Sequence, residues 1–256
     1  MKKTFLCFFI FTFLFLANHA SATTYSFNNS SFTPYGDASY ASGEVQLTSP
    51  ANGQSGSIFL DTALRASSFI ASFDFKISEI NSPYGADGVT FAWVIHQGSG
   101  AGGGELGFTG LDGYMVEFDH YWNSGYEPPG SALPFDNTNH VAIAQAVDNP
   151  LDYFLLPFDL EDNIWRHVDI TFNNGQLKLQ IDSVEYLNST IPGYSSFDAY
   201  FGFTGSTGAS YSRQLVRDFE LTINQPAVPE PTTVLLLGAG AICLAGLGRK
   251  AIFRKG

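Results

Sequence analysis

Short runs of alternating apolar and polar residues follow one another through most of the chain. They are rich in Phe, Tyr, Val and Ile and show almost no helical period, which is typical of half-buried strands. The runs span residues 69–77, 89–95, 114–121, 140–147, 165–172, 177–181, 199–204 and 216–223. Asn173-Asn174-Gly175 separates two of them and predicts a hairpin turn. Regularly spaced strands of this kind predict an all-β fold, with two antiparallel sheets packed face to face.

The strand at residues 114–121 carries an unusual set of polar side chains. Successive side chains of a strand point to opposite faces, so Glu117, Asp119 and Tyr121 share one face. Phe118 and His120 take the other. Two carboxylates that point at one spot repel each other unless they share a proton or bind a cation. The plainer alternative is a pair of solvated acids on an exposed strand face.

More candidate metal ligands follow this strand. Asn123 and Glu127 lie in the loop after it, and His140 is the first residue of the next predicted strand, 140–147. Oxygen-rich ligands suit calcium, and an added imidazole suits a transition metal beside it. Asn123 could also be a simple turn former, because Asn is common after strands.

The same residues carry a resemblance to a known family. Glu117-Phe118-Asp119, Asn123, Glu127-Pro128 and His140-Val141-Ala142-Ile143 resemble the metal-binding core of the legume-type (L-type) lectins. Three further stretches match in the same order, namely Gly85-Ala86-Asp87-Gly88, the glycine run 102–108 and the segment 203–209. Each motif alone is weak. Four motifs in the family's order over roughly 200 residues, the size of one large all-β sandwich, make a strong resemblance.

The resemblance implies a fold, metals and a metal site. The fold is the concanavalin-like jelly-roll β-sandwich, in which a concave sheet and its loops make the sugar site. The implied cofactor is calcium, with manganese as a candidate for a second site. In the family manner the Tyr121 carbonyl would bind calcium, and Asn123 would bind both calcium and the sugar. The implied metal ligands are Glu117, Asp119, Tyr121, Asn123, Glu127 and His140.

The resemblance also implies a sugar site. Asp87 would bind sugar hydroxyls from a cis Ala86-Asp87 peptide, although a turn acid is the plainer reading. Glycines 102–104 would offer backbone N–H groups, although they could simply be a flexible connection. The loop of Gly208 and Ala209 would adjust the monosaccharide preference. The implied carbohydrate-binding residues are Asp87, Gly103, Gly104, Tyr121, Asn123, Gly208 and Ala209.

Two features depart from the family pattern. Glu127 stands where the family usually has Asp, so its carboxylate reaches one methylene further. The loop at 128–139 is longer than in plant members, and either Asp136 or Asn137 within it could supply a ligand. The calcium site tolerates such variation because its geometry is flexible. The transition-metal site depends on His140 meeting the carboxylates across this insertion.

The two ends of the chain predict export and processing. Lys2 and Lys3, the apolar run 5–16 and Ala20-Ser21-Ala22 are typical of a secretory signal peptide spanning residues 1–22. A short linker, 224–229, ends the lectin-like domain at 23–226. The tail at 227–256 holds Val228-Pro229-Glu230-Pro231, an apolar segment at 232–248 long enough to just cross a bilayer, and a basic end.

This tail resembles the PEP-CTERM sorting signal of Gram-negative bacteria. The resemblance implies an exosortase-type membrane protease as a partner, and attachment to the membrane through the tail before processing. An ordinary single-span anchor is the alternative reading. Either way, the protein is expected to reach the cell surface or the extracellular space.

Charge and cysteine content agree with such a location. All 24 acidic residues lie between Thr23 and Pro231 with only six basic ones, so this region carries 6 − 24 = −18. Such a charge argues against nucleic acid as a partner and favours divalent cations. Cys7 and Cys243 lie in the two end segments, so the domain is expected to be stabilised by its core and bound metal rather than by disulfides.

Three functions fit the sequence. The first is a calcium-dependent lectin that binds exopolysaccharide or another glycan. The second is a glycoside hydrolase, because hydrolases with this fold also use paired carboxylates on one strand. Their catalytic strand presents Glu, Asp and a second Glu, whereas this face runs Glu117, Asp119, Tyr121, which argues against an enzyme. The third is a structural surface protein that has kept the fold without sugar binding.

Overall fold

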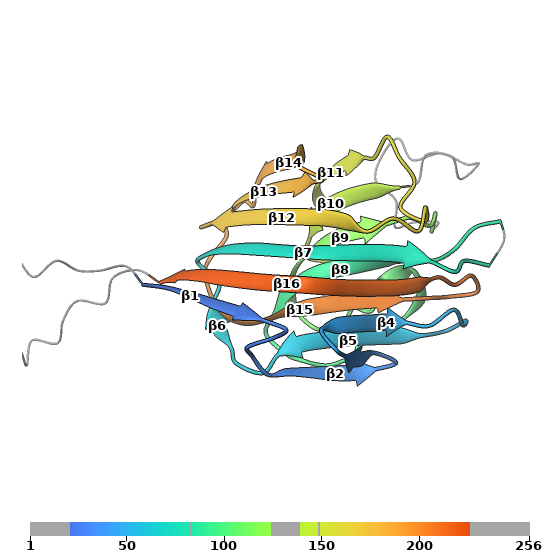
Figure 1. Ribbon diagram of the computed structural model, residues 1–256. Helices are drawn as coiled ribbons and strands as arrows, with labels where there is room; N and C mark the ends of the chain where they lie inside the picture. The colour runs from blue at the N-terminus through green and yellow to red at the C-terminus, as the bar shows by residue number, and fades with distance from the viewer. Residues whose placement is uncertain (1–20, 82, 124–138, 148, 226–256) are drawn as a thin grey trace, which may run out of the picture. The chain divides into compact units, whose positions relative to one another are not determined.

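The computed structural model describes residues 21–81, 83–123, 139–147 and 149–225, and all structural statements concern these residues. By its internal contacts, the segment Ala22–Asn224 forms one compact unit. Its described residues form β-strands and one short 3-10 helix, η1 (Gly103–Glu105) (Figure 1). No helix within the described part is long and apolar enough to cross a membrane, and the predicted span at 232–248 lies outside it.

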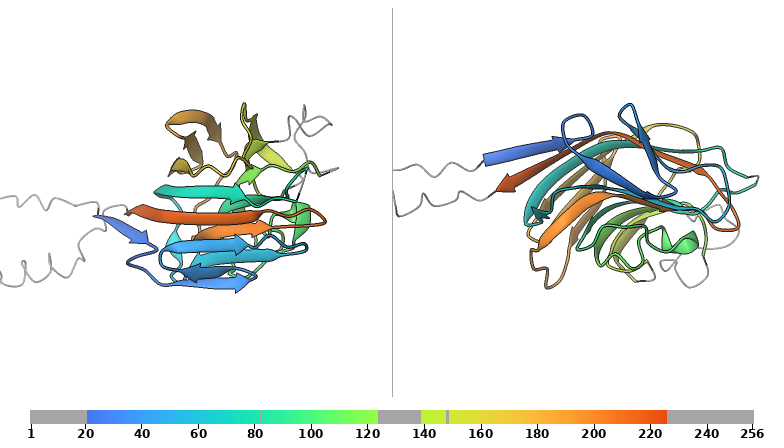
Figure 2. Two further views of the ribbon diagram at one scale, coloured as in Figure 1. Left: turned by 45° about the vertical axis from the view of Figure 1, so that its right-hand side comes forward. Right: turned by 90° about the horizontal axis from the view of Figure 1, so that it is seen from below.

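The strands form two antiparallel sheets, which lie as two layers in Figure 2. The first sheet has the order β14-β13-β12-β7-β16-β4-β3, with β1 paired to β16. Its strands are β1 (Ser21–Ser26), β3 (Ser39–Ala41), β4 (Glu44–Thr48), β7 (Ser68–Ser78), β12 (Arg166–Asn173), β13 (Gln176–Ile181), β14 (Val184–Thr190) and β16 (Arg213–Gln225).

The second sheet has the order β11-β10-β9-β8-β15-β5-β2, with β6 paired to β15. Its strands are β2 (Phe32–Gly36), β5 (Ser55–Leu60), β6 (Leu64–Arg65), β8 (Gly88–Val94), β9 (Gly113–Asp119), β10 (His140–Ala144), β11 (Pro150–Leu155) and β15 (Asp198–Ser206). The prediction of an all-β sandwich is therefore confirmed.

The space between the sheets is filled mainly by Phe side chains. Phe73 of β7 lies 4.8 Å, centroid to centroid, from Phe203 of β15 in an edge-to-face arrangement, and 5.8 Å from Phe91 of β8. Such ring pairs add to the burial of apolar area that drives folding. Because period-2 alternation sends every second residue to this core, all the strands of the sequence pattern contribute to it. Strands outside the pattern, β4, β5 and β14, add further apolar side chains.

Each strand predicted from alternation is present, with shifted ends. Asn174 and Gly175, both at positive φ, form the hairpin turn between β12 and β13. β9 ends at Asp119 rather than at 121, because the Tyr121 N–H donates to Asp119 Oδ1 (2.9 Å) and turns the chain. Tyr121 therefore does not continue the strand face on which its alternation placed it.

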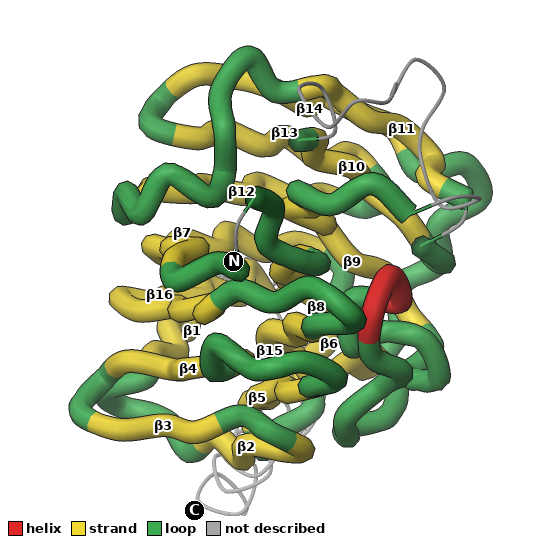
Figure 3. The backbone as a smooth tube through the Cα atoms, turned by 90° about the vertical axis from the view of Figure 1, so that its right-hand side faces the viewer, coloured by secondary structure: helices red, strands yellow, loops and turns green. Residues whose placement is uncertain are grey.

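A second, smaller apolar cluster covers the outer face of the second sheet. It joins Ala92, Met115 and Ala144 of the strands to Leu106 and Phe108 of the glycine-rich loop. All seven residues of β8 are consequently buried, since one face meets the core and the other meets this loop. Figure 3 shows η1, in red, within this loop next to β8 and β9.

Candidate functional site

The outer face of β9 holds two buried carboxylates. Val116 and Phe118 point into the core, whereas Glu117 and Asp119 point to the other face. Glu117 is 1% exposed and Asp119 is 2% exposed, so the alternative of solvated acids on an open strand face is wrong. A buried carboxylate loses its hydration and needs hydrogen bonds or a cation in return.

β10 adds an imidazole to this pair. The antiparallel register places His140 opposite Asp119, and His140 Nε2 lies 3.4 Å from Glu117 Oε1. The other oxygen, Glu117 Oε2, is buried and accepts no hydrogen bond from any described residue. An orphaned carboxylate oxygen next to a histidine is the donor chemistry of a divalent cation site.

Polar groups of Asp119, Tyr121 and Asn123 lie next to one another where β9 ends. Asn123 Nδ2 lies 3.1 Å from Asp87 Oδ1 and 3.4 Å from the Tyr121 carbonyl oxygen. The Asp119 carboxylate, which accepts the Tyr121 N–H, completes the group. Three members of the predicted calcium set are thus neighbours, and the fourth, Glu127, lies outside the described residues.

These donors fit calcium. Carboxylate, main-chain carbonyl and amide oxygens are the ligands that calcium takes. Within the described ranges no group of three or more His, Cys, Asp or Glu side chains is gathered tightly enough to hold a metal ion. A calcium site of the predicted kind does not require one, since two of its donors are a carbonyl and an amide.

Asp87 lies beside this group and is the other buried acid of the site. The Ala86-Asp87 peptide is cis, as the resemblance implied. The Asp87 N–H donates to the Ser206 carbonyl (2.9 Å), and Asp87 Oδ2 is buried without a described hydrogen-bond partner. Burial raises the pKa of this carboxyl, while the hydrogen bond from Asn123 and the nearby His120 act in the opposite direction.

The predicted glycines pack directly against these side chains. A Cβ on Gly104 would lie only 2.7 Å from Asn123 Cγ, and one on Gly208 would lie 3.4 Å from Asp87 Oδ2. Gly103 has φ +67° and lies close to Gly208. Any side chain at Gly104 would displace Asn123, so the lack of one lets the loop backbone approach the amide.

Hydroxyl groups of β15 hold the glycine-rich loop in place. Ser206 Oγ donates to the Gly103 carbonyl (2.6 Å), and Thr204 Oγ1 donates to the Leu106 carbonyl (2.7 Å). Both hydroxyls lie on one face of β15, two residues apart. Sequence reasoning did not assign them a role, although their spacing on a strand next to a glycine loop was a usable signal.

Ala209 is the exposed member of the predicted sugar-binding set. Its carbonyl accepts a hydrogen bond from Asn52 Nδ2 (3.1 Å), and the neighbouring Gly208 carbonyl accepts one from the Gly53 N–H (3.0 Å). The turn between β4 and β5 thus supports this loop. The structure brings Asp87, Gly103, Gly104, Asn123 and Gly208 together, with Tyr121 and Ala209 at the borders.

Comparison with known families agrees with this geometry. The model of the legume lectin domain matches residues 20–235. The chain belongs to the legume lectin domain family. The PEP-CTERM protein-sorting motif matches residues 227–250, so both parts of the sequence resemblance are confirmed.

Solved structures of lectins share the fold of this legume lectin domain. Winged bean acidic lectin, complexed with methyl-α-D-galactose, has a TM-score of 0.63 and 20% identity, over 81% of this chain and 100% of that one. A lectin from Bauhinia forficata in complex with GalNAc has a TM-score of 0.63 and 19% identity, over 81% of this chain and 100% of that one. The exoplasmic/lumenal domain of VIP36, in a Ca²⁺/Man3GlcNAc-bound form, has a TM-score of 0.59 and 14% identity, over 79% of this chain and 88% of that one.

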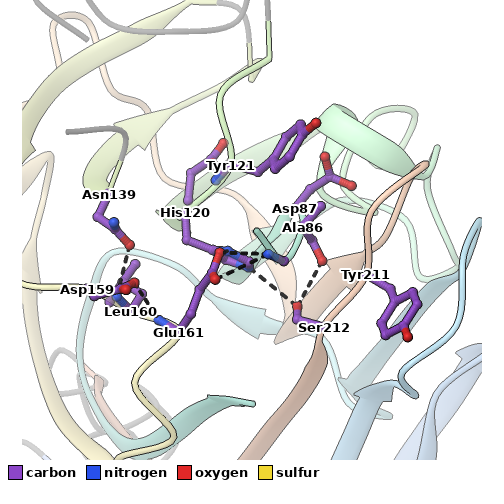
Figure 4. Close-up of polar contacts among 12 residues, drawn as sticks. Ala86, Asp87, His120, Tyr121, Asn139, Asp159, Leu160, Glu161, Tyr211 and Ser212 are labelled. Atoms are coloured by element: carbon purple, nitrogen blue, oxygen red, sulfur yellow. Dashed lines mark hydrogen bonds and ion pairs between the residues drawn. The ribbon is translucent and has the colours of Figure 1, made fainter. Parts of the chain in front are cut away.

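Sequence reasoning missed a second polar group of this legume lectin domain, on the far side of the Asp87 segment. His120 lies with Nδ1 2.7 Å from Glu161 Oε1 (Figure 4). Ser212 and Gln214 contact the same segment through the Ala86 carbonyl. Glu161 is more than 40 residues from His120 in the sequence, and no local pattern links the two.

Proposed function

We propose that this chain is an exported, calcium-dependent carbohydrate-binding protein without catalytic activity. The observation that carries the proposal is the buried Asp87 carboxylate, whose Oδ2 has no hydrogen-bond partner among the described residues. It faces Gly208 and the Asn123 amide. A sugar hydroxyl that donates to Asp87 would supply the missing hydrogen bond, and buried polar atoms generally require one.

Calcium would be held by Asp119, the Tyr121 carbonyl, Asn123 and Glu127. When bound, it would fix the loop after β9 and neutralise buried negative charge. Asn123 would then present its amide, and Gly103 and Gly104 their backbone N–H groups, to the ligand beside Asp87. Glu117 and His140 support a second metal site, for which manganese is the candidate.

A binding protein is favoured over an enzyme on this face. Glycoside cleavage needs two carboxyl groups placed on either side of the scissile bond. Glu117 and Asp119 are both buried, and the chain turns at Tyr121, where the hydrolases carry a further Glu. Product analysis on oligosaccharides is expected to show no shortening.

The sorting motif supports a location at the surface of a Gram-negative cell, reached through a signal peptide at 1–22. We expect the exopolysaccharide matrix or another envelope glycan to be the ligand. A single lectin site binds weakly, so dense display on a surface would add the avidity it needs.

The binding test uses a glycan array and titration calorimetry with calcium and with EDTA. Asp87→Ala is expected to weaken binding at least tenfold, because a hydrogen bond to a charged group contributes about 1.5–3 kcal/mol. Asp87→Asn, which keeps the shape, checks that the loss is not due to misfolding. Asp198→Ala removes one exposed carboxylate elsewhere and serves as the control. Unchanged binding by both Asp87 variants would place the sugar site elsewhere on the sandwich.

Processing of the tail is tested separately. In a host that has the matching exosortase-type protease, mass spectrometry of the mature protein is expected to show a chain that lacks the segment from Leu235 onward. Recovery of the intact C-terminus at Gly256 in the membrane fraction would favour the ordinary anchor instead.

A further inference from the structure

Side chains outside the predicted site form hydrogen bonds with the backbone of the segment that carries Asp87, on the side opposite to its carboxylate. Ser212 Oγ donates to the Ala86 carbonyl at 2.8 Å. The Gly85 N–H donates to the Glu161 carboxylate, with distances of 3.1 and 3.2 Å to its two oxygens. In Figure 4 the Asp87 carboxylate points away from Ser212 and Glu161, so these contacts leave it open to a ligand.

Glu161 also binds the strand end that follows Asp119. Its Oε1 lies 2.7 Å from His120 Nδ1, and the His120 side chain is fully buried. The His120 N–H in turn donates to the Asp87 carbonyl at 3.2 Å. Gly85, Asp87, His120 and Glu161 therefore form a closed ring of contacts. The Glu161 carboxylate touches both sides of it, and Ser212 Oγ adds a longer contact with His120 Nε2 at 3.4 Å.

The position of Glu161 is itself fixed. It lies in the connection between β11 and β12, where its N–H donates to Asp159 Oδ1 at 2.9 Å. The preceding residue, Leu160, is buried, and its N–H donates to Asn139 Oδ1 at 2.9 Å. A carboxylate held this way can act as a rigid support for the Asp87 segment.

We propose that Glu161 is a positioning residue of the carbohydrate site, which sets the Asp87 carboxylate by clamping Gly85 and His120 together. This inference rests on the proposed function. Glu161 acts through these residues and does not touch the sugar. Its removal takes the acceptor from the Gly85 N–H and the carboxylate partner from His120 Nδ1 at once, so the Asp87 segment loses two of its supports. The bond between the Tyr121 N–H and Asp119 at the calcium donors does not involve Glu161.

The test compares Glu161→Ala, Glu161→Gln and the wild-type full chain. Sugar affinity is measured by calorimetry with mannose, methyl-α-D-galactose and the strongest glycan of the array, and calcium affinity is measured in the same way. Glu161→Ala is expected to lower sugar affinity at least tenfold and calcium affinity less than threefold. Glu161→Gln keeps an oxygen for Gly85 and an amide for His120, so it is expected to restore most of the sugar affinity. Glu185→Ala on β14, which removes an equal charge from an exposed ion pair, is the control.

Hydrogen exchange supplies a readout that does not depend on sugar. In Glu161→Ala the amides of Gly85 and Asp87 are expected to exchange at least tenfold faster, with the melting temperature of the domain nearly unchanged.

If the wild type binds no glycan, the proposed function fails, and unchanged exchange at these amides then overturns the positioning role of Glu161 as well. If the wild type binds and Glu161→Ala binds equally well, the positioning role is wrong and the proposed function stands. A parallel loss of sugar and calcium affinity that Gln does not restore would indicate a general structural role and also overturn the inference.

Discussion

The two sheets each carry a histidine–carboxylate pair on their outer face, and the two pairs differ in burial. On β9 and β10, Glu117 and His140 are both 1% exposed and lie 3.4 Å apart. On β7 and β12, Asp74 and His167 are 18% and 49% exposed and lie 2.8 Å apart. Both arise from polar residues at alternate positions of a strand. The two pairs differ in what surrounds them, because the first is closed off from solvent and the second is open to it.

The surroundings of the two pairs differ in charge as well. Arg217 lies 3.2 Å from Asp74 and stacks 4.0 Å above the Trp165 ring, so the surface acid has a cationic partner. The sequence contains no Lys or Arg between Lys76 and Arg166, the region that supplies Asp87, Glu117 and Asp119. Buried acids without a Lys or Arg partner from their own segment would be stabilised by a cation supplied from outside the chain. This contrast is the physical argument for a bound divalent cation.

The largest expected effect is therefore at the calcium donors next to the buried pair, where Asp119 lies opposite His140. A cation that binds only the folded state adds about 2.7 kcal/mol to the free energy of unfolding at 100 times its dissociation constant. Thermal unfolding is expected to shift upward with calcium and downward with EDTA, and Asp119→Ala is expected to abolish the difference. Equal melting temperatures of the wild type in calcium and EDTA would contradict a calcium ion beside the buried pair.

A smaller effect is expected at the surface pair. Arg217→Gln removes an exposed ion pair and a cation–π contact, each of which contributes up to about 1 kcal/mol. The resulting loss in the free energy of unfolding of Arg217→Gln is expected to become smaller with added salt and to be the same in calcium and in EDTA. Urea denaturation at low and high salt, in calcium and in EDTA, measures this loss. A loss that depends on calcium would show that the two faces are coupled.

The smallest effect is a pH dependence of the surface pair. The hydrogen bond to Asp74 raises the pKa of His167 above its usual value, against the opposing effect of partial burial. Protonated His167 therefore stabilises the fold fully below about pH 6.5, and this contribution is lost as the pH rises through the raised pKa. The difference in unfolding free energy between wild type and His167→Gln is expected to fall across this range. His96→Gln, in an exposed loop, is the control, and a constant difference for His167→Gln would contradict the assignment.

Much of the fold could be predicted because it depends on local alternation. The strands predicted at 69–77 and 89–95 correspond to β7 and β8, and each of their ends is shifted by one residue. Strands of mixed composition, such as β2 and β11, were missed, because their burial alternates only partly and comes from pairing with neighbours. β9 was expected to reach Tyr121, but a side-chain hydrogen bond ended it at Asp119.

By itself, the sequence determined the sandwich, the charge of the domain and the candidate residues of the site, because strand period and motif spacing are properties of neighbouring residues. Only the tertiary structure decided that Glu117 and Asp119 are buried, that Gly104 packs on Asn123, and that Glu161 supports the Asp87 segment. Those contacts join residues far apart in the chain. They depend on how loops fold over a sheet, and no local pattern of apolar and polar residues encodes that.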